Sequence, residues 1–389
     1  MEDWTCIICG VTGDLGYRKL LPAIYELVGQ HDFTENDFLI IGCAYEEASF
    51  SAIWDEVVQA WDSYDEERLA WLKERSYYYA LDFSDADGFK ELSHTIARKE
   101  HAFNLPGNRL VYCAVPADFF CDVTQYIVDE AIVEPSNERH RIVYEKPFGR
   151  NYASAQEINA CIHDNGLQPQ QVYRVDHYLS KEFISNITLL RFTNELFEGT
   201  WHRDYIDRIE IYCKESLTVS GRGAYYDRYG ASRDMVQSHM LQMLALTAME
   251  RPDRVIDRGM EAEKTHVLQN THFVTGVRGQ YEGYRQEENV DTESQTETAF
   301  VGEWRINTDR WRDVPIYMLT GKAMDEKRTE IRIVYKASQH AFFKETITCD
   351  PDILIIRVAQ KSGFILYVNS KQPNSIRETM PVKLDFCHS

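Results

Sequence analysis

The sequence has few basic residues for its length. Of its 389 residues, 42 are Lys or Arg and 62 are Asp or Glu, which gives a formal net charge of −20. Because nucleic acids and anionic membranes recruit Lys and Arg to their phosphates, this acidic surplus argues against a general binder of either. A phosphate-bearing ligand would have to be held by a local cluster of basic side chains, against the field of the whole chain.

Long apolar segments are lacking as well. No stretch approaches the roughly 20 uncharged apolar residues that a membrane span needs. Residues 1–4 (MEDW) also lack the positive charge and the long apolar core of a secretory signal. We therefore expect no membrane span and a cytoplasmic location.

Cysteine provides no disulfide or metal framework. The nine cysteines are scattered along the chain, and only Cys6 and Cys9 form a CxxC pair. Both lie in an apolar run, where their spacing points them to opposite faces of a strand. Core packing is therefore favoured over a zinc or redox role, and a reducing compartment is expected.

What is present suits a globular protein of two domains, with 44% hydrophobic and 27% charged residues. Residues 1–176 alternate short apolar runs with helical patterns. Strands are predicted at 5–9, 38–44, 77–81, 109–115 and 141–144, with helices after the first strand and near 51–73, 86–101, 119–133 and 153–163. This alternation predicts a Rossmann-like, doubly wound parallel sheet.

Residues 177–389 have a different pattern, with strands at intervals and little helix between them. Strands are predicted at 206–213, 298–307, 316–320, 329–335, 354–359 and 363–369, and one buried helix at 232–249. This pattern predicts an α+β domain with a large, mostly antiparallel sheet. The acidic segment 282–297 is expected to be a mobile loop.

A glycine-rich loop follows the first predicted strand. Gly10, Gly13 and Gly16 form GxxGxxG where the first helix opens. Such glycines let the backbone approach a pyrophosphate, which the N-terminal N–H groups of the helix stabilise. An ordinary glycine-rich turn is the alternative. The position after an N-terminal strand favours a dinucleotide site.

The end of the second predicted strand bears on the choice between NAD and NADP. It reads Tyr45-Glu46-Glu47, with no basic residue. An acidic side chain there binds the ribose 2′-OH of NAD, whereas Arg accommodates the 2′-phosphate of NADP. These residues favour NAD, unless the two glutamates are simply a solvated helix start.

Three short segments concentrate reactive groups. They are 145–149 (EKPFG), 174–181 (RVDHYLSK) and 221–239, which ends at a histidine. Lys146 follows a strand and should emerge at the edge of the sheet where ligands bind. Taken singly, each residue has an ordinary reading: His239 as a core histidine, Lys146 as an ion-pair partner, Asp176 as a cap and Lys181 as a surface charge.

In these segments and several others, the chain resembles the glucose-6-phosphate dehydrogenases. The matching motifs are GVTGDLGYRKLLP (10–22), VYCAVP (111–116), VYEKPFGR (143–150), RVDHYLSKE (174–182), KESLTVSGRGAYYDRYGASRDMVQSHMLQMLALTAMERP (214–252), GQYEGY (279–284) and VPIYMLTGKAMDEKRTEIRI (314–333). They cover most of the chain in order, and the EKPFG, RxDHYLxKE and RDxxQxH blocks together are highly specific.

The resemblance implies hydride transfer from C1 of β-D-glucose 6-phosphate to NADP or NAD. The product is 6-phosphoglucono-lactone, and the reaction is the first step of the oxidative pentose phosphate pathway. Because the C1 hydroxyl must lose its proton as hydride leaves, a general base is needed. The resemblance makes His239 that base and Asp176 the residue that orients its imidazole.

The resemblance also implies the binding residues. Substrate-binding residues would be Lys146, His177, Tyr178, Lys181, Glu215, Asp227, Lys322 and Lys327. Cofactor-binding residues would be Gly10, Thr12, Gly13, Asp14, Leu15, Lys19, Tyr45, Tyr112, Pro116 and Lys146. A cis bond before Pro147 and a homo-oligomer formed through the sheet of the second domain are implied too, with no metal, nucleic acid or membrane partner.

The chain departs from the family pattern at several points. Tyr45 stands where the family has Arg, Ser238 replaces an Asn, and Ala359 falls where some members have Gln. The chain stops at Ser389, roughly a hundred residues short of the usual family length. Without C-terminal helices over the large sheet, exposed apolar surface would need a partner or a different quaternary arrangement, or would lower the stability of the protein.

These departures leave two alternatives to the main hypothesis. One is a dehydrogenase of another hexose 6-phosphate. The other is a catalytically weak or inactive paralogue that binds dinucleotide or sugar phosphate for regulation. The presence of every reactive residue named above favours catalysis, since an inactive chain would be expected to lose some of them.

Overall fold

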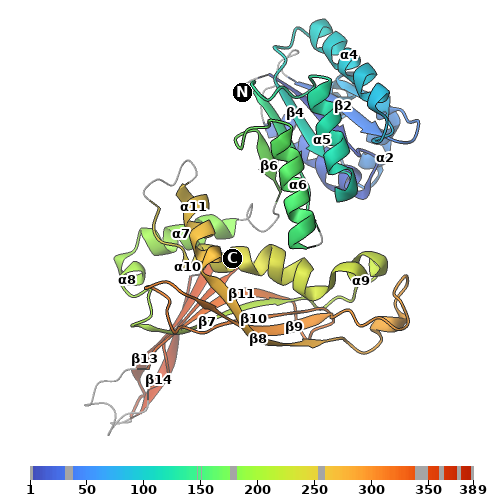
Figure 1. Cartoon of the computed structure of the whole chain (residues 1–389). Helices are drawn as coiled ribbons and strands as arrows, with labels where there is room; N and C mark the ends of the chain where they lie inside the picture. Colours follow the sequence, from blue (N-terminus) through green and yellow to red (C-terminus); the bar gives the residue numbers. More distant parts are fainter. Residues whose placement is uncertain are drawn as a thin grey trace. The chain divides into compact units, whose positions relative to one another are not determined.

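The computed structural model describes the chain in nine ranges. These are residues 3–30, 38–146, 148–149, 151–175, 182–252, 259–337, 349–358, 363–374 and 378–386, with only the backbone described for 182–186. The chain divides into two compact units, Met1–Val175 and Asp176–Ser389 (Figure 1).

The first unit is built on a six-stranded sheet with the order β3-β2-β1-β4-β5-β6. The strands are β1 (Trp4–Cys9), β2 (Phe38–Ala44), β3 (Ser76–Ala80), β4 (Arg109–Cys113), β5 (His140–Tyr144) and β6 (Val172–Arg174). All neighbouring strands pair in parallel. The predicted doubly wound parallel sheet is confirmed, and β6 was not foreseen.

Helices cover both faces of this sheet. They are η1 (Gly16–Leu20), α1 (Leu21–Gln30), α2 (Phe50–Gln59), α3 (Glu66–Glu74), α4 (Ala86–Ala102), η2 (Ala117–Phe119), α5 (Phe120–Asp129) and α6 (Tyr152–Asp164). The helices α4, α5 and α6 pack on one face with Cys9, whereas α1, α2 and α3 pack on the other with Cys6. The two cysteines therefore lie in separate cores, as their spacing predicted.

One helix predicted near 51–73 is two helices in the structure. The first, α2, ends at Gln59, and α3 begins after Asp65. The Asp65 carboxylate accepts the Arg68 N–H at 3.0 Å and so satisfies one of the free N–H groups at the start of α3. The polar side chains between the two helices hid this boundary from a reading of apolar periodicity.

The second unit is built on an eight-stranded sheet with the order β14-β13-β12-β11-β7-β10-β9-β8. The strands are β7 (Ile206–Lys214), β8 (Thr271–Gly279), β9 (Ala299–Ile306), β10 (Ile316–Gly321), β11 (Arg328–Tyr335), β12 (Ile353–Arg357), β13 (Gly363–Lys371) and β14 (Thr379–Asp385). The described pairs are antiparallel except β7 with β10, which is parallel. The predicted mostly antiparallel sheet is confirmed; β8 and β14 were not foreseen.

Strand register gives this sheet two unlike faces. One row across five neighbouring strands consists of Trp304, Ile316, Ile209, Ile333 and Leu354, all buried. Helices cover this face: α7 (Glu182–Phe192), η3 (Ser232–Met240), α10 (Leu241–Ala248) and α11 (Gly259–Gln269) contribute to its core. The other face carries the aligned residues Val277, Val301, Leu319 and Tyr212, of which Val277 and Val301 are exposed.

The acidic segment 282–297, for which the sequence predicted a mobile loop, is largely exposed but contains two buried residues, Tyr284 and Ser294. Tyr284, in the short helix η4 (Tyr284–Gln286), is fully buried. Its hydroxyl donates to the Asp227 carboxylate at 3.0 Å from α9 (Gly223–Ala231), and the Ser294 hydroxyl donates to the same carboxylate. Two buried residues, Tyr284 and Ser294, therefore anchor this segment to α9 through Asp227.

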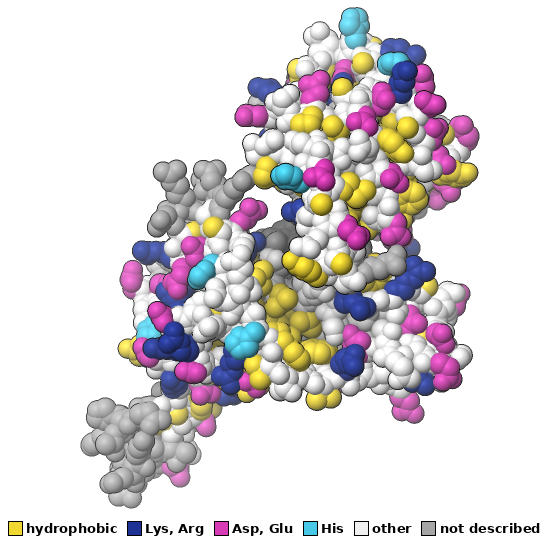
Figure 2. All heavy atoms as spheres, viewed as in Figure 1, with side chains coloured by type: hydrophobic (Ala, Val, Ile, Leu, Met, Phe, Trp, Pro, Cys, Tyr) yellow, Lys and Arg dark blue, Asp and Glu magenta, His cyan; other side chains and the backbone are white. Residues whose placement is uncertain are grey.

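The visible surfaces of both units carry mixed charge. In the view of Figure 2, acidic and basic side chains are interspersed. Among the residues that the structure describes, no helix has the length and apolar character that a membrane crossing needs.

Candidate active site

The glycine loop lies between the carboxyl ends of two central strands in the first unit. Gly10, directly after β1, has φ +89°, and a Cβ there would lie 2.6 Å from the carbonyl oxygen of Ala114, just after β4. Gly10 is therefore required both by its backbone angle and by the close approach of the neighbouring chain. The strand order reverses between β1 and β4, the switch point at which doubly wound sheets bind dinucleotides.

The first helix after this loop begins with a π-helical turn, η1, which carries the exposed Lys19. The loop itself turns tightly, because the Gly13 N–H donates to the Gly10 carbonyl at 3.1 Å. The Asp14 carboxylate and the Arg18 guanidinium form an exposed ion pair at 2.7 Å. The loop therefore has the open backbone that a pyrophosphate requires, with a cation on the turn that follows it.

The rim of the loop next to β2 is acidic. The Thr12 hydroxyl donates to the Glu46 carboxylate at 3.2 Å, while Tyr45 is 74% exposed. Burial, followed by the Glu46 carboxylate, raises the pKa of Tyr78 to about 12. Burial, followed by the charges of Glu56 and Glu46, also raises the pKa of Tyr17. The negative charge of Glu46 thus contributes to the raised pKa values of both tyrosines.

The ends of the parallel strands β4 and β5 bring Tyr112 and Lys146, both predicted for the site, to the same sheet edge. Tyr112 on β4 donates its hydroxyl to the Glu145 carboxylate, which lies directly after β5 and is 7% exposed. Burial and this hydrogen bond raise the pKa of Tyr112 well above its ordinary value. Lys146 comes next in the chain and is half-buried, and Pro116 precedes η2. Pro147 lies outside the described residues.

In the second unit, Glu215 and Lys322 meet at the ends of the parallel strands β7 and β10. Their carboxylate and ammonium groups are 2.5 Å apart, and Lys322 is largely buried. The Lys322 Nζ also lies 5.1 Å from the ring centroid of the buried Tyr226. A backbone bond from the Glu215 N–H to the Gly321 carbonyl, at 2.9 Å, fixes the two strand ends together. The lysine is therefore held in one place by a carboxylate and a π-face.

His239 lies in the helix that follows α9. It is 3% exposed and sits in the π-helical segment η3. A π-helix bonds each residue to the fifth one along, so residues five apart lie closer together around the helix axis than they do in an α-helix. Asp234 stands five residues before His239, and its carboxylate accepts the Tyr225 hydroxyl at 3.3 Å. Burial, followed by the Asp234 charge, raises the pKa of Tyr225.

Asp234 was not among the residues predicted for the site. Only the spacing Asp-x₄-His in the sequence pointed to it, and in an ordinary α-helix that spacing separates the two side chains around the axis. The π-helical turn reduces this separation, and no local pattern in the sequence predicts such a turn.

The remaining predicted substrate residues are distributed differently. The Asp227 carboxylate is engaged by Tyr284 and Ser294 of the acidic segment. Lys327 is exposed in the connection between β10 and β11. Asp176, His177, Tyr178, Lys181 and Ala359 lie outside the described residues. No group of three or more His, Cys, Asp or Glu side chains within the described part of the chain is placed to hold a metal ion.

A parallel doubly wound sheet with a close-packed glycine loop at its switch point places the chain in the class of dinucleotide-dependent oxidoreductases. Family models make the class specific. The model for the NAD binding domain of glucose-6-phosphate dehydrogenase matches residues 7–186, and the model for its C-terminal domain matches residues 188–389. The chain belongs to the glucose-6-phosphate dehydrogenase family.

Individual relatives agree with this assignment. The glucose-6-phosphate 1-dehydrogenases of Chlamydia pneumoniae and Bacillus subtilis are 35% and 33% identical over 98% of this chain, covering 79% and 81% of their own lengths. The crystal structure of the Mycobacterium avium enzyme is similar with a TM-score of 0.88 at 30% identity, covering all of this chain and 84% of that one. A glucose-6-phosphate dehydrogenase in complex with its substrate glucose 6-phosphate has a TM-score of 0.89 at 28% identity, covering 99% and 82%.

Proposed function

We propose that this chain oxidises β-D-glucose 6-phosphate at C1 to the 6-phosphoglucono-lactone, with a nicotinamide dinucleotide as oxidant. The observation that carries the proposal is the Glu215–Lys322 pair at the ends of β7 and β10, in the same unit as the buried His239. It is supported by relatives named glucose-6-phosphate 1-dehydrogenase and by a similar structure that holds glucose 6-phosphate.

His239 accepts the proton of the C1 hydroxyl as the hydride leaves C1. Imidazole is the side chain whose ordinary pKa suits proton transfer near neutral pH. Asp176 orients the ring and stabilises the imidazolium that results. Asp234 lies one π-helical turn away from His239 and adds a carboxylate to the same helix.

Glu215 and Lys322 bind the sugar. Lys322 donates to substrate oxygens from an ammonium already fixed by Glu215 and Tyr226, so little side-chain freedom is lost on binding. Glu215, which is partly exposed, accepts sugar hydroxyls with its second oxygen. The 6-phosphate is held by His177, Tyr178 and Lys181, cations and donors suited to a dianion. Lys146 and Lys327 supply further positive charge, and Asp227 accepts hydrogen bonds from the acidic segment.

The residues around the glycine loop fit a dinucleotide. The backbone at Gly10, Thr12, Gly13, Asp14 and Leu15 would hold the pyrophosphate, because this loop leads directly into the N-terminus of the first helix, where N–H groups favour an anion. Lys19, Tyr112 and Pro116 flank this loop. When bound, the nicotinamide ring accepts the hydride.

We favour NAD over NADP. The Glu46 carboxylate reaches the loop at Thr12 and can accept the ribose 2′-OH, whereas a 2′-phosphate would meet its negative charge. Tyr45 supplies no positive charge to offset that repulsion. The preference is read as the ratio of kcat/KM values with the two dinucleotides, which we expect to favour NAD.

A spectrophotometric assay tests the activity. Protein, glucose 6-phosphate and each dinucleotide are mixed, and the absorbance of the reduced nicotinamide is followed. We expect turnover, faster than with other hexose 6-phosphates. Absence of turnover with both dinucleotides, together with calorimetric binding of either ligand, would instead identify a regulatory binding protein.

The sheet of the second unit supports a homo-oligomer. Val277, Val301 and Tyr317 are exposed on the face opposite the helices, at 74%, 44% and 38%. Val277 and Val301 are direct partners on neighbouring strands and Tyr317 lies on the next strand, so exposed apolar residues on three strands of this face suit burial against a second copy. Light scattering after size-exclusion chromatography should give a dimer or larger, and Val277→Lys should shift the population towards monomer. A monomeric wild type would contradict this assembly.

A further inference from the structure

The helix that carries His239 begins at an unusual junction. The helix α9 is broken at Gly230, where φ is +68° and ψ is 173°, and the π-helical segment η3 starts two residues later. The first N–H groups of any helix have no partner within the helix and need acceptors from elsewhere. The N-cap residue of η3 is Ala231, whose methyl side chain cannot accept a hydrogen bond.

Glu297, far along the chain, provides two of these acceptors. The Ala231 N–H donates to the Glu297 carbonyl at 2.9 Å, and the Ser232 N–H donates to the Glu297 carboxylate at 3.0 Å. The carboxylate also lies against the break, since a Cβ at Gly230 would come within 2.8 Å of it. One residue therefore fills the junction and caps the start of η3, with a negative charge at the positive end of the helix.

Glu297 is connected to the substrate lysine through the next residue. The carbonyl of Thr298, which is fully buried, accepts the Lys322 N–H at 3.0 Å. The Thr298 hydroxyl accepts the Tyr281 N–H at 2.8 Å, which ties this position to the acidic segment. The dipeptide 297–298 thus contacts both the start of the His239 helix and the backbone of Lys322.

The far end of the same helix is held by buried side chains. Trp201 and Trp311 donate from their indoles to the Thr247 and Ala248 carbonyls at 2.8 and 2.7 Å. Arg191, which is fully buried, donates to the Thr247 and Met249 carbonyls, both at 2.9 Å. These contacts satisfy carbonyls that the end of α10 leaves without helical partners.

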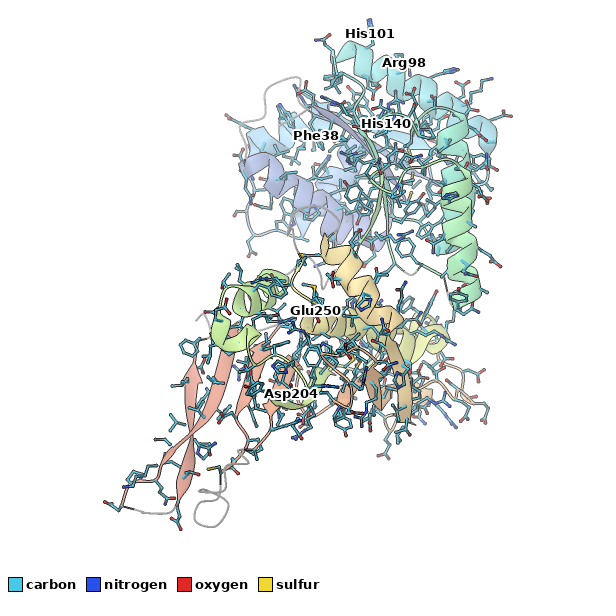
Figure 3. All side chains as sticks on the ribbon, turned by 60° about the vertical axis from the view of Figure 1, so that its left-hand side comes forward. Phe38, Arg98, His101, His140, Asp204 and Glu250 are labelled. Carbon is cyan, nitrogen blue, oxygen red and sulfur yellow. The ribbon has the colours of Figure 1, made fainter. Side chains whose placement is uncertain are left out.

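An ion-pair network supports this far end from outside. The Glu198 carboxylate contacts Arg191 and Arg310, each at 3.2 Å, and Arg310 pairs with Glu250 at 2.6 Å. Glu250, labelled in Figure 3, lies just after α10. The C-terminal end of the helix 232–248 is fixed in this way. The position of its N-terminal end then sets the length available to the helix, and so the number of residues in each turn. A π-helical turn holds more residues than an α-helical turn and is much rarer, so contacts that fix both ends favour keeping the extra residue within the segment.

We propose that Glu297 is a positioning residue that keeps the segment 232–240 in its π-helical register and thereby places His239 for proton transfer. Without the cap, the segment can relax towards the commoner α-helical register, which rotates His239 about the helix axis. The proposal rests on the proposed function, in which His239 is the general base.

Three variants test it. Glu297→Ala removes the side-chain acceptor, Glu297→Gln keeps an oxygen at the same place without the charge, and Glu293→Ala alters an exposed glutamate of the same segment as a control. For Glu297→Ala we expect kcat to fall by about tenfold or more, the scale of one lost charge-assisted hydrogen bond, with KM for glucose 6-phosphate nearly unchanged. Glu297→Gln should recover most of the loss, and Glu293→Ala should match wild type.

Hydrogen exchange gives a second readout that does not depend on turnover. Amides of residues 232–240 should exchange faster in Glu297→Ala than in Glu297→Gln, while the α10 amides stay protected. Unchanged kcat per folded molecule in Glu297→Ala, or a loss that Glu297→Gln fails to recover, would overturn the positioning role. Absence of turnover in the wild type would count against the proposed function instead, and exchange alone would then decide whether Glu297 anchors the helix. If Glu297→Ala does not fold, the comparison is made with Glu297→Asp, which keeps the charge but shortens its reach.

Discussion

Both units place functional groups at the ends of neighbouring parallel strands, but they do so by different means. In the first unit, β1 and β4 present the bare backbone of a glycine loop around Gly10. In the second, β7 and β10 present the side chains of Glu215 and Lys322. A backbone site suits a pyrophosphate, which any chain can bind through N–H groups, whereas a side-chain site can discriminate between sugars. The comparison predicts that substitutions in the glycine loop mainly weaken dinucleotide binding, whereas substitutions in the second unit mainly affect the sugar-phosphate substrate.

The largest effect should come from the second unit. His239→Asn should lower kcat by about 10²–10⁴-fold, because Asn cannot accept a proton. Binding of sugar phosphate and dinucleotide, measured by calorimetry, should stay near wild type. A variant that instead loses sugar binding with kcat intact would show that His239 is a binding residue rather than the base.

The backbone site of the first unit should be nearly as sensitive. Gly10→Ala forces a Cβ towards the Ala114 carbonyl in a backbone conformation that L-residues rarely adopt. We expect dinucleotide affinity to fall by more than about tenfold and stability to fall by about 1–3 kcal/mol. Sugar-phosphate binding should persist if the protein stays folded. Gly279→Ala is the matched control, since its Cβ would lie 3.9 Å from the nearest atom.

Substitution in the Glu215–Lys322 pair should have the opposite effect, weakening the interaction with the sugar substrate and leaving dinucleotide binding intact. Lys322→Met should raise KM for glucose 6-phosphate by about tenfold, the scale of a lost charge-assisted hydrogen bond, and leave dinucleotide affinity unchanged. Glu215→Gln and the double variant complete a cycle that measures the coupling of the two residues. Additive effects would show that they act independently despite their 2.5 Å contact.

The acidic rim of the glycine loop predicts a smaller effect. Tyr45→Arg combined with Glu46→Gln should raise the ratio of kcat/KM with NADP to that with NAD by about tenfold, since a cation replaces a carboxylate at the 2′ position. Glu47→Gln, next in the chain and also exposed, serves as the control. A wild type that already prefers NADP would contradict the role given to Glu46.

The smallest effect concerns a histidine that belongs to neither site. His140 on β5 is 2% exposed; its Nδ1 accepts the Glu134 N–H and its Nε2 bonds to the Gly107 carbonyl, both at 2.9 Å (Figure 3). Burial lowers its pKa. Below about pH 6.5 the unfolded chain therefore binds a proton at this histidine that the folded chain does not bind. The free energy of unfolding falls as the pH drops below that value.

A denaturation series at several pH values tests this histidine. His140→Gln should remove a slope of at most about 1.4 kcal/mol per pH unit, the value for one proton. Dinucleotide and sugar affinities at neutral pH should not change. An unchanged slope in His140→Gln would assign the pH dependence to other groups.

The two sites also differ in how far the sequence predicted them. The glycine loop is a local pattern, so its three glycines and its place after β1 could be read from the sequence, although its role as a dinucleotide site rested on its position and on the family resemblance. The pairing of Glu215 with Lys322 joins residues 107 positions apart, and only the family resemblance brought them together. Strands with continuous apolar runs, such as β2, were located to the residue. The strand β8 was missed because most of its residues are exposed and it has no apolar face to mark it.

The helix that carries His239 shows a further limit of the sequence. Its length and burial were evident from its apolar residues, but its π-helical start was not. That geometry depends on Glu297 at one end and on Arg191, Trp201 and Trp311 at the other. Contacts from such distant segments leave no trace in local periodicity, so Asp234 was overlooked.

The parallel pairing of β7 with β10 has a consequence for how the protein folds. Two strands separated by about a hundred residues must meet before Glu215 and Lys322 can pair, and contacts between distant segments form late because a long loop must close first. The glycine loop has a similar requirement, because β1 and β4 are also about a hundred residues apart and must pair before Gly10 can pack on Ala114. During refolding, dinucleotide binding and sugar-phosphate binding should therefore both return late, and turnover should return last.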